Sequence, residues 1–178
     1  MSLQPPPSYH APRHAPRVVV ATIGRASTRE DYAKIIIDGL EGAHFTFVRS
    51  VTVTREKQFI QQLVSNVANS NEADAIVLIG GVGLGPRDFT CEAVEELADR
   101  RIEGFGEAYR RMLRETLNVG TEALLERATA VVYNKCVVFA LPQQLVPLQR
   151  AVQTLVIPTL TQAVRAAEGV SGPPPSNV

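Results

Sequence analysis

A run of glycines behind an apolar segment constrains the fold of this chain more than any other feature. Residues Ala75–Ile79 are continuously apolar, which is typical of a strand buried on both faces of a parallel sheet. Four glycines and a proline come next: Gly80, Gly81, Gly83, Gly85 and Pro86. Asp88 and Thr90 are residue types that cap helix N-termini, and acidic residues follow in the first turns of a predicted helix over 89–98. The sequence therefore predicts a strand, a glycine turn and the start of a helix.

Such a turn is a candidate anion site. In open α/β sheets, ligands bind at the carboxyl ends of the strands. Glycines let backbone N–H groups approach an anion closely, and a helix N-terminus adds unpaired donors and the positive end of its dipole. The turn lacks the Gly-Lys-Ser/Thr of a Walker loop and the glycine spacing of a dinucleotide fold. A turn of this kind can also serve only to connect two elements.

Strand-like and helix-like segments alternate along the chain. Strands are predicted at 17–23, 45–53, 75–79, 128–133 and 136–141, and helices at 32–40, 56–68, 89–98, 102–117, 121–126, 146–156 and 159–167. Asn134 and Lys135 form a predicted two-residue hairpin turn, and Pro158 is expected to kink or restart the last helix. This order predicts an α/β fold: a mostly parallel sheet with helices on both faces and one antiparallel edge strand.

Length and composition predict a single domain over 17–167 between proline-rich tails at 1–16 and 168–178 that we expect to be disordered. The 18 basic and 18 acidic residues balance, which argues against binding to nucleic acid or to an anionic membrane. No segment is apolar over a length that could span a bilayer, so we expect a cytoplasmic protein. Cys91 and Cys136 then fit reduced structural thiols, although a helix dipole could lower the pKa of Cys91.

The sequence around the glycines resembles a known family. Gly-Gly-x-Gly followed by Pro86-Arg87-Asp88-x-Thr90, and then Gly104-Phe105, is similar to the MoaB/Mog family of molybdenum cofactor biosynthesis proteins. The resemblance implies a three-layer α/β/α fold, a homotrimer or hexamer, and binding of molybdopterin, the phosphorylated pterin of the cofactor. In some members it also implies adenylyl transfer to that phosphate from ATP with Mg²⁺.

The resemblance and the charge pattern together give a set of candidate ligand-binding residues: Arg55, Gly80, Gly81, Val82, Gly83, Arg87, Asp88, Thr90, Glu126 and Arg127. Asp88 is the candidate catalytic and Mg²⁺-binding residue, and an N-cap role for it remains equally open. Capping is the favoured role for Thr90 and for Glu92.

The sequence departs from the family pattern in five places, all at expected ligand loops. Val82 replaces the loop threonine, and Arg55 replaces an acid, so that a guanidinium stands where a Mg²⁺ ligand is expected. Glu126 replaces the serine of Ser-Arg-Ala, and Gln143-Gln144 replaces Gly-Ser after Leu141-Pro142. The Ser-Asp that ends the first strand is missing near Ile23-Gly24-Arg25.

These departures leave three hypotheses open. The chain could bind molybdopterin or another phosphorylated small molecule while being impaired in adenylyl transfer. It could instead be a scaffold or interaction protein that keeps the fold without the ligand chemistry. A competent transferase using ATP and Mg²⁺ is the third hypothesis. Arg55 could itself bind a phosphate, and Glu126 could neutralise Arg55 or Arg127 and close the site.

Overall fold

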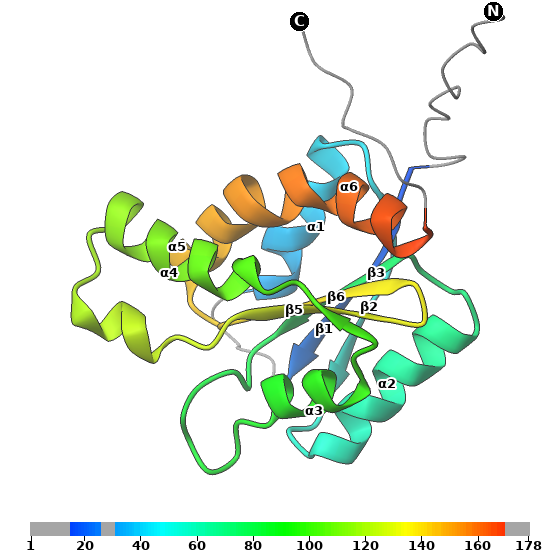
Figure 1. The fold of residues 1–178 in the computed structure, drawn as a ribbon, viewed down its shortest axis with the longest axis horizontal. Coiled ribbons are helices and arrows are strands. Elements are labelled where there is room, and N and C mark those ends of the chain that lie inside the picture. The colour runs from blue at the N-terminus through cyan, green and yellow to red at the C-terminus, as the bar shows by residue number, and fades with distance from the viewer. Residues whose placement is uncertain (1–14, 26–30, 170–178) are drawn as a thin grey trace, which may run out of the picture.

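The computed structural model describes residues 15–25 and 31–169 of this chain, which build a six-stranded sheet between two layers of helices (Figure 1). The strands are β1 (Arg17–Ile23), β2 (Thr46–Val53), β3 (Ala75–Ile79), β4 (Arg100–Arg101), β5 (Thr129–Tyr133) and β6 (Cys136–Leu141). Their order across the sheet is β2-β1-β3-β6-β5-β4, and the first four are parallel. Strand β5 runs antiparallel to β6. The predicted fold class is confirmed.

The helices divide between the two faces. One face is covered by α1 (Tyr32–Gly42), α4 (Gly104–Thr116), α5 (Leu145–Ala151) and α6 (Ile157–Ala167), and the other by α2 (Lys57–Asn69) and α3 (Thr90–Leu97) (Figure 1). The two-residue period of β1 explains the division, since Val18 and Val20 pack on the first layer while Val19 and Ala21 pack on the second. Each layer therefore buries its own apolar cluster against the sheet.

The hairpin between β5 and β6 turns as predicted. Asn134 and Lys135 have φ angles of 44° and 66°, and Tyr133 pairs with Cys136 directly across the turn. Two successive positive φ angles match the twist of the flanking strands, as in a type I′ turn. Asp31 is the N-cap of α1, and its carboxylate accepts a hydrogen bond from the Lys34 amide at 3.0 Å.

Two features of the second half were not predicted in this form. The short strand β4 pairs with β5, and two residues are too few to show an alternating pattern. A π-helical turn at Val152–Val156 joins α5 to α6, and Pro158 lies in the first turn of α6. Because proline has no N–H group, the helix loses one hydrogen bond there and widens instead of ending.

The expected tails lie almost wholly outside the described residues. None of the helices in the described part of the chain is both long and apolar enough to cross a membrane.

Candidate functional site

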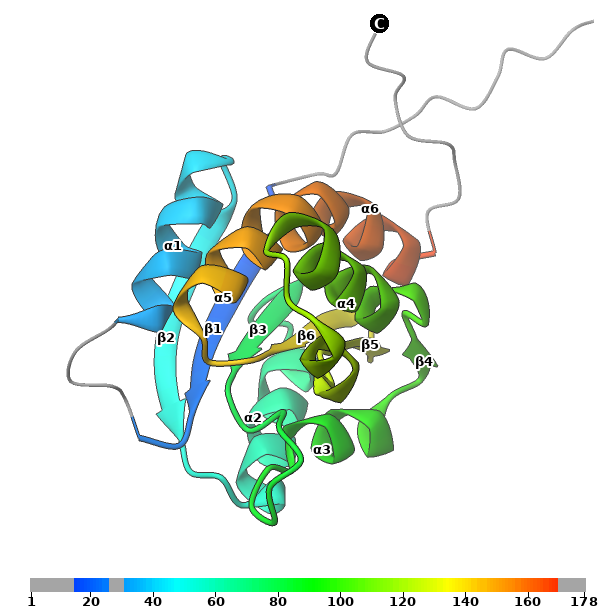
Figure 2. The same cartoon turned by 90° about the vertical axis from the view of Figure 1, so that its left-hand side faces the viewer.

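The candidate site lies where the direction of the chain crossovers changes. Strands β1 and β3 are neighbours, yet β1 leads to α1 on one face and β3 leads to α3 on the other (Figure 2). In open α/β sheets such a switch point leaves a crevice at the carboxyl ends of the two strands, and ligands bind there. Residues Gly80–Phe89, which we call the glycine loop, connect β3 to α3 at this point.

A side chain from α3 holds the start of the glycine loop. Gly80 and Gly81 have φ angles of 101° and 67°, which other residues rarely adopt. The Thr90 hydroxyl donates a hydrogen bond to the Gly80 carbonyl at 2.8 Å, and the Thr90 amide donates to the Gly81 carbonyl at 2.9 Å. The capping role predicted for Thr90 is therefore wrong: it is the first residue of α3, is fully buried, and locks the loop.

Asp88 is not a helix cap either. Phe89 occupies the N-cap position of α3, while the Asp88 carboxylate turns back into the glycine loop and accepts a hydrogen bond from the Gly85 amide at 3.1 Å. Its Oδ2 lies 2.7 Å from the position that a Cβ would take at either Gly83 or Gly85. The loop thus closes around a negative charge of its own.

Arg55 reaches the glycine loop from the end of β2. Its Nη1 lies 3.7 Å from Oδ1 of Asp88, and its Nε lies 2.7 Å from the position of a Cβ at Gly24. The arginine side chain therefore passes over the end of β1 toward the loop. It is 46% exposed, against 20% for Asp88, so its cationic group remains accessible to solvent.

Two other candidates near the loop behave differently from one another. Val82 is 3% exposed and packs with Cys91 and Ala140, so its side chain points into the protein instead of toward solvent. Arg87 is exposed, and it makes no ion pair with any residue in the described ranges. Gln143, one of the departures from the family pattern, places its Oε1 3.1 Å from a Cβ position at Gly80.

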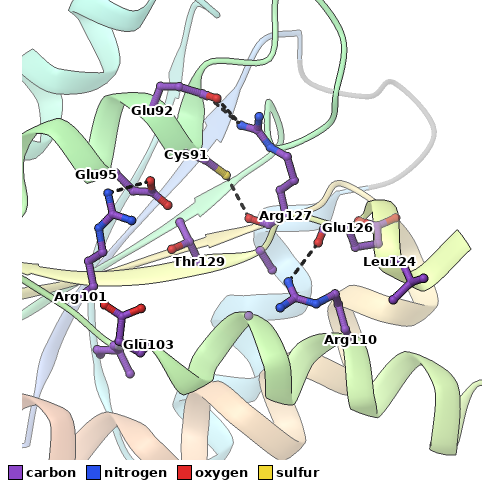
Figure 3. A pocket seen from close by; sticks show the side chains of 13 residues that line it. Cys91, Glu92, Glu95, Arg101, Glu103, Arg110, Leu124, Glu126, Arg127 and Thr129 are labelled. Carbon is purple, nitrogen blue, oxygen red and sulfur yellow. Dashed lines mark hydrogen bonds and ion pairs between the residues drawn. The ribbon is translucent and has the colours of Figure 1, made fainter.

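Glu126 and Arg127 belong to a second group, in a pocket between α3, the start of α4 and the entry to β5 (Figure 3). The pocket has a volume of about 420 Å³. Its lining includes three arginines and four glutamates: Arg101, Arg110, Arg127, Glu92, Glu95, Glu103 and Glu126. Helix α3 connects the two groups, since Thr90 locks the glycine loop and the next two residues line the pocket.

Arg127 is neutralised, although not by Glu126. Its Nη2 lies 2.7 Å from the Glu92 carboxylate, and the two side chains point toward each other in Figure 3. Glu92 therefore makes this ion pair instead of the predicted capping interaction. Glu126 accepts a hydrogen bond from Gln144 at 3.3 Å, and Asp88 is the acid that faces Arg55. The Nε of Arg127 is buried and has no partner among the described residues.

Cys91 lines the pocket as a neutral thiol. Its Sγ donates to the Arg127 carbonyl at 3.0 Å, and burial raises the pKa of Cys91 to about 11. The hypothesis that the helix dipole lowers this pKa is wrong, because the cost of desolvating a thiolate outweighs it. Both cysteines are free and buried, as expected of structural thiols.

The sequence did not single out several residues of the pocket. Arg101 pairs with Glu95 at 3.1 Å, and Arg110 donates to the Glu126 carbonyl at 3.4 Å. A signal was present in the helix that follows: a Cβ at Gly106 would lie 2.7 Å from the Ala128 carbonyl. A glycine inside a helix weakens it, so its presence there indicates a close approach of two backbones.

The residues around Asp88 do not fit a Mg²⁺ site. Mg²⁺ prefers several oxygen ligands in octahedral geometry, and it is repelled by a guanidinium at ion-pair distance. Asp88 is the acid in the glycine loop, and one of its oxygens accepts the Gly85 amide while the other faces Arg55. Within the described ranges, no cluster of three or more His, Cys, Asp or Glu side chains could hold a metal ion.

Comparison with known proteins places this geometry in a known group. Residues 18–162 match the family described as "Probable molybdopterin binding domain". Molybdenum cofactor biosynthesis protein B of Bacillus subtilis is 33% identical over 149 residues, which cover 84% of this chain and 87% of that protein. A crystal structure of molybdenum cofactor biosynthesis protein B has a TM-score of 0.81 at 28% identity, covering 90% of this chain and 99% of that one. The tungsten cofactor synthesizing protein MoaB of Pyrococcus furiosus has a TM-score of 0.75 at 26% identity, covering 88% and 99%.

Proposed function

We propose that this chain, which belongs to the MoaB/Mog family of molybdenum cofactor biosynthesis proteins, binds molybdopterin and does not carry out efficient adenylyl transfer. One observation carries the binding half of this proposal. The amides of Gly81, Val82, Gly83 and Leu84 donate no hydrogen bond to another described residue. Successive unpaired amides in a glycine turn at a switch point form a concave site for an anion such as a phosphate.

The adjoining pocket supports a ligand larger than phosphate. It begins at Cys91, directly after the threonine that locks the glycine loop. Its arginines supply donors and its glutamates supply acceptors, which suits a heterocycle whose edge carries both. A phosphorylated pterin has such an edge at one end and an anion at the other.

The chemistry of Arg55 supports the second half of the proposal. Adenylyl transfer from ATP requires Mg²⁺ to neutralise the charge that develops on the phosphates. The resemblance implies an acid at this position, whereas the guanidinium here cannot bind a metal ion. The family glycine after Leu141-Pro142 is also replaced, by Gln143, whose side chain approaches Gly80. The loops that would position the nucleotide therefore differ at two points.

A scaffold role is the second candidate, and specific contacts favour it. Two of the candidate ligand-binding arginines already face acids, Arg55 with Asp88 and Arg127 with Glu92. A site whose cations are already neutralised gains less from an anion, because each contact replaces an existing one. In this candidate the family fold would be kept for assembly with other proteins.

The proposal includes a homotrimer or hexamer, as the family resemblance implies. Exposed apolar side chains near the start of α5 support an assembly: Leu124, Leu125, Leu145 and Val146 are between 37% and 65% exposed. The hydrogen bond between Gln144 and Glu126 holds the segment 124–126 beside the segment 144–146. Clustered apolar surface is typical of interaction sites. Light scattering on a size-exclusion column measures the mass directly, and a monomer at micromolar concentration would contradict this part.

Calorimetric titration of the full chain tests the binding proposal. Molybdopterin, AMP and inorganic phosphate are the probes, and we expect binding of molybdopterin that weakens as salt is added. Incubation with molybdopterin, ATP and Mg²⁺ should yield no adenylylated product at a rate useful to a cell. Robust turnover would refute the loss of adenylyl transfer. Absence of binding to all three probes would leave the scaffold role as the remaining candidate.

A glycine pair provides the matched control. Gly81→Ala places a Cβ 2.4 Å from the Thr90 hydroxyl at a positive φ, so it should distort the glycine loop and abolish binding. Gly42→Ala adds the same methyl group at the end of α1, where nothing lies within 4 Å, and should bind like the parent. Equal binding by the two variants would show that the loop only connects β3 to α3.

A further inference from the structure

A positive charge is present at this site, at the place where the metal chemistry of the family would need a metal ion. Arg55 takes the position of an expected acid and lies at the switch point over Gly24. A ligand phosphate carries close to two negative charges near neutral pH and needs a counter-charge when it leaves water. The guanidinium supplies that charge from the chain itself.

The existing ion pair leaves Arg55 free to bind more. The 3.7 Å between its Nη1 and Asp88 Oδ1 is an ion-pair distance but too long for a hydrogen bond. A guanidinium carries five donors in a planar fork, and none of them forms a hydrogen bond with a residue that the structure describes. Since nearly half of the side chain is exposed, an incoming phosphate can accept two of these donors at once.

Asp88 meanwhile occupies the place of an anion. Its Oδ2 accepts the Gly85 amide and lies within 3 Å of the Cβ positions of Gly83 and Gly85. A phosphate drawn to the unpaired amides next to Gly85 and to Arg55 meets the like charge of this carboxylate. In a site that binds Mg²⁺ such an acid would raise the affinity for a phosphate, whereas beside a guanidinium it lowers it.

We infer that Arg55 replaces a divalent cation as the counter-charge for the ligand's phosphate, so that binding is independent of metal, and that Asp88 is an internal competitor for the same site. This inference rests on the proposed function and adds to it the charge logic of the phosphate site. It reverses the expected sign of an Asp88 substitution. Removal of the acid increases affinity.

Titration of the metal-free full chain with molybdopterin, AMP or inorganic phosphate, in EDTA and again in Mg²⁺, tests metal independence. The dissociation constant should agree within about twofold between the two buffers. Asp88→Asn keeps an oxygen for the Gly85 amide while removing the charge, and should tighten binding about two- to fivefold, as expected for a partly exposed charge. Arg55→Gln should weaken binding at least about tenfold, since it loses a charge-assisted contact.

Two further variants separate this inference from simpler accounts. Arg55→Lys keeps the charge without the fork and should bind between the parent and Arg55→Gln. Lys57→Gln removes a nearby cation that pairs with Glu96 instead of the glycine loop, and should bind like the parent. Thermal unfolding of each variant checks that the fold is retained.

The outcomes distinguish the inference from the proposed function. Binding that appears only with Mg²⁺, or that is lost in Asp88→Asn, would overturn the inference while molybdopterin binding by the parent still stood. Absence of binding in both buffers would overturn both. An Arg55→Gln variant that binds like the parent would assign the phosphate to the loop amides alone, and would also refute the role of Arg55.

Discussion

The contact between Gly81 and Thr90 gives a prediction about stability whose size follows from the structure. An alanine at position 81 must adopt a φ near 67°, which costs about 1–2 kcal/mol for a residue with a Cβ. Its Cβ would also lie 2.4 Å from the Thr90 hydroxyl, which must then move and leave the buried Gly80 carbonyl without its donor. Losing that partner costs about 1–3 kcal/mol. After a small offset from the stiffer unfolded chain, the net loss should be about 2–4 kcal/mol.

Urea denaturation followed by circular dichroism, at fixed protein concentration, measures this loss. A chain of this size should melt roughly 5–15 °C below the parent in a thermal scan. The control Gly42→Ala lies at the end of α1 with open space around it, and should be unchanged or more stable by up to about 1 kcal/mol. Both variants carry the same chemical change, yet only Gly81→Ala should lose stability.

A double-mutant cycle then isolates the cause. Thr90→Ala removes the hydroxyl that an alanine at position 81 would strike, and it forfeits the same hydrogen bond to Gly80. The double variant should therefore be less destabilised than the sum of the single variants by about 1–3 kcal/mol, the value of a bond that is lost only once. Strict additivity would show that Thr90 does not lock the glycine loop, and a Gly81→Ala variant as stable as the parent would refute the whole argument.

Three further predictions concern other residues. Val82→Thr restores the family residue but buries a hydroxyl beside Cys91 and Ala140, so urea denaturation should show a free energy of unfolding lower by about 1–3 kcal/mol. The double variant with Arg55→Asp should show no gain of adenylyl transfer in a product assay. Burial raises the pKa of the Cys91 thiol from 9.0 to about 11, so the stability that the neutral thiol contributes should be lost as the pH rises from 9 to 11. Cys91→Ala should show a smaller loss of stability over this pH range. A native thiol that is alkylated as fast at pH 8 as the thiol of the urea-unfolded chain would contradict the assignment. The hydrogen bond from Arg49 lowers the pKa of Glu72, so the stability that this contact provides above about pH 4.5 should disappear on acidification. In Glu72→Gln the free energy of unfolding, measured by denaturation at several pH values, should fall less steeply as the pH is lowered.

Periodicity and turn chemistry predicted the fold class and five of the six strands. The apolar run 75–79 is β3 with the predicted bounds, and the apolar run 136–141 is β6. The glycines after β3 lie at the carboxyl end of a parallel strand, as the pattern indicates. These features are local, because each depends on neighbours within one turn of helix or one strand. A local rule therefore identifies them without knowledge of the whole chain.

The capping roles failed for a physical reason. Asp88 and Thr90 have the side chains of good caps and stand at the start of a helix, so propensity alone favours capping. In the structure the glycine loop offers each of them another partner, the Gly85 amide for Asp88 and the Gly80 carbonyl for Thr90. The geometry of that loop depends on two positive φ angles and on the packing of α3 against the sheet. No propensity scale contains that information.

The charge pairs could not be predicted because their partners are distant in sequence. Arg127 and Glu92 are brought together by the packing of α3 against the entry to β5, and Arg55 and Asp88 by the order of the strands. The sequence allowed, as one alternative, that an acid would neutralise Arg55 or Arg127. It suggested Glu126, which instead accepts from Gln144. Charge balance was visible in the sequence, while the choice of partner was not.

The pairing of Arg55 with Asp88 changes how the departure at position 55 should be interpreted. An acid at position 55, as the resemblance implies, would add a second negative charge on the side of the loop from which Arg55 approaches Asp88. Two carboxylates near each other repel unless a cation lies between them. An arginine at one of the two positions removes the repulsion and supplies the cation in the same change. The loss of the metal ligand is thus coupled to the gain of a positive charge at the end of β1. That charge is what a phosphate needs where no metal is bound, so under our proposal the residue that argues against adenylyl transfer also favours binding.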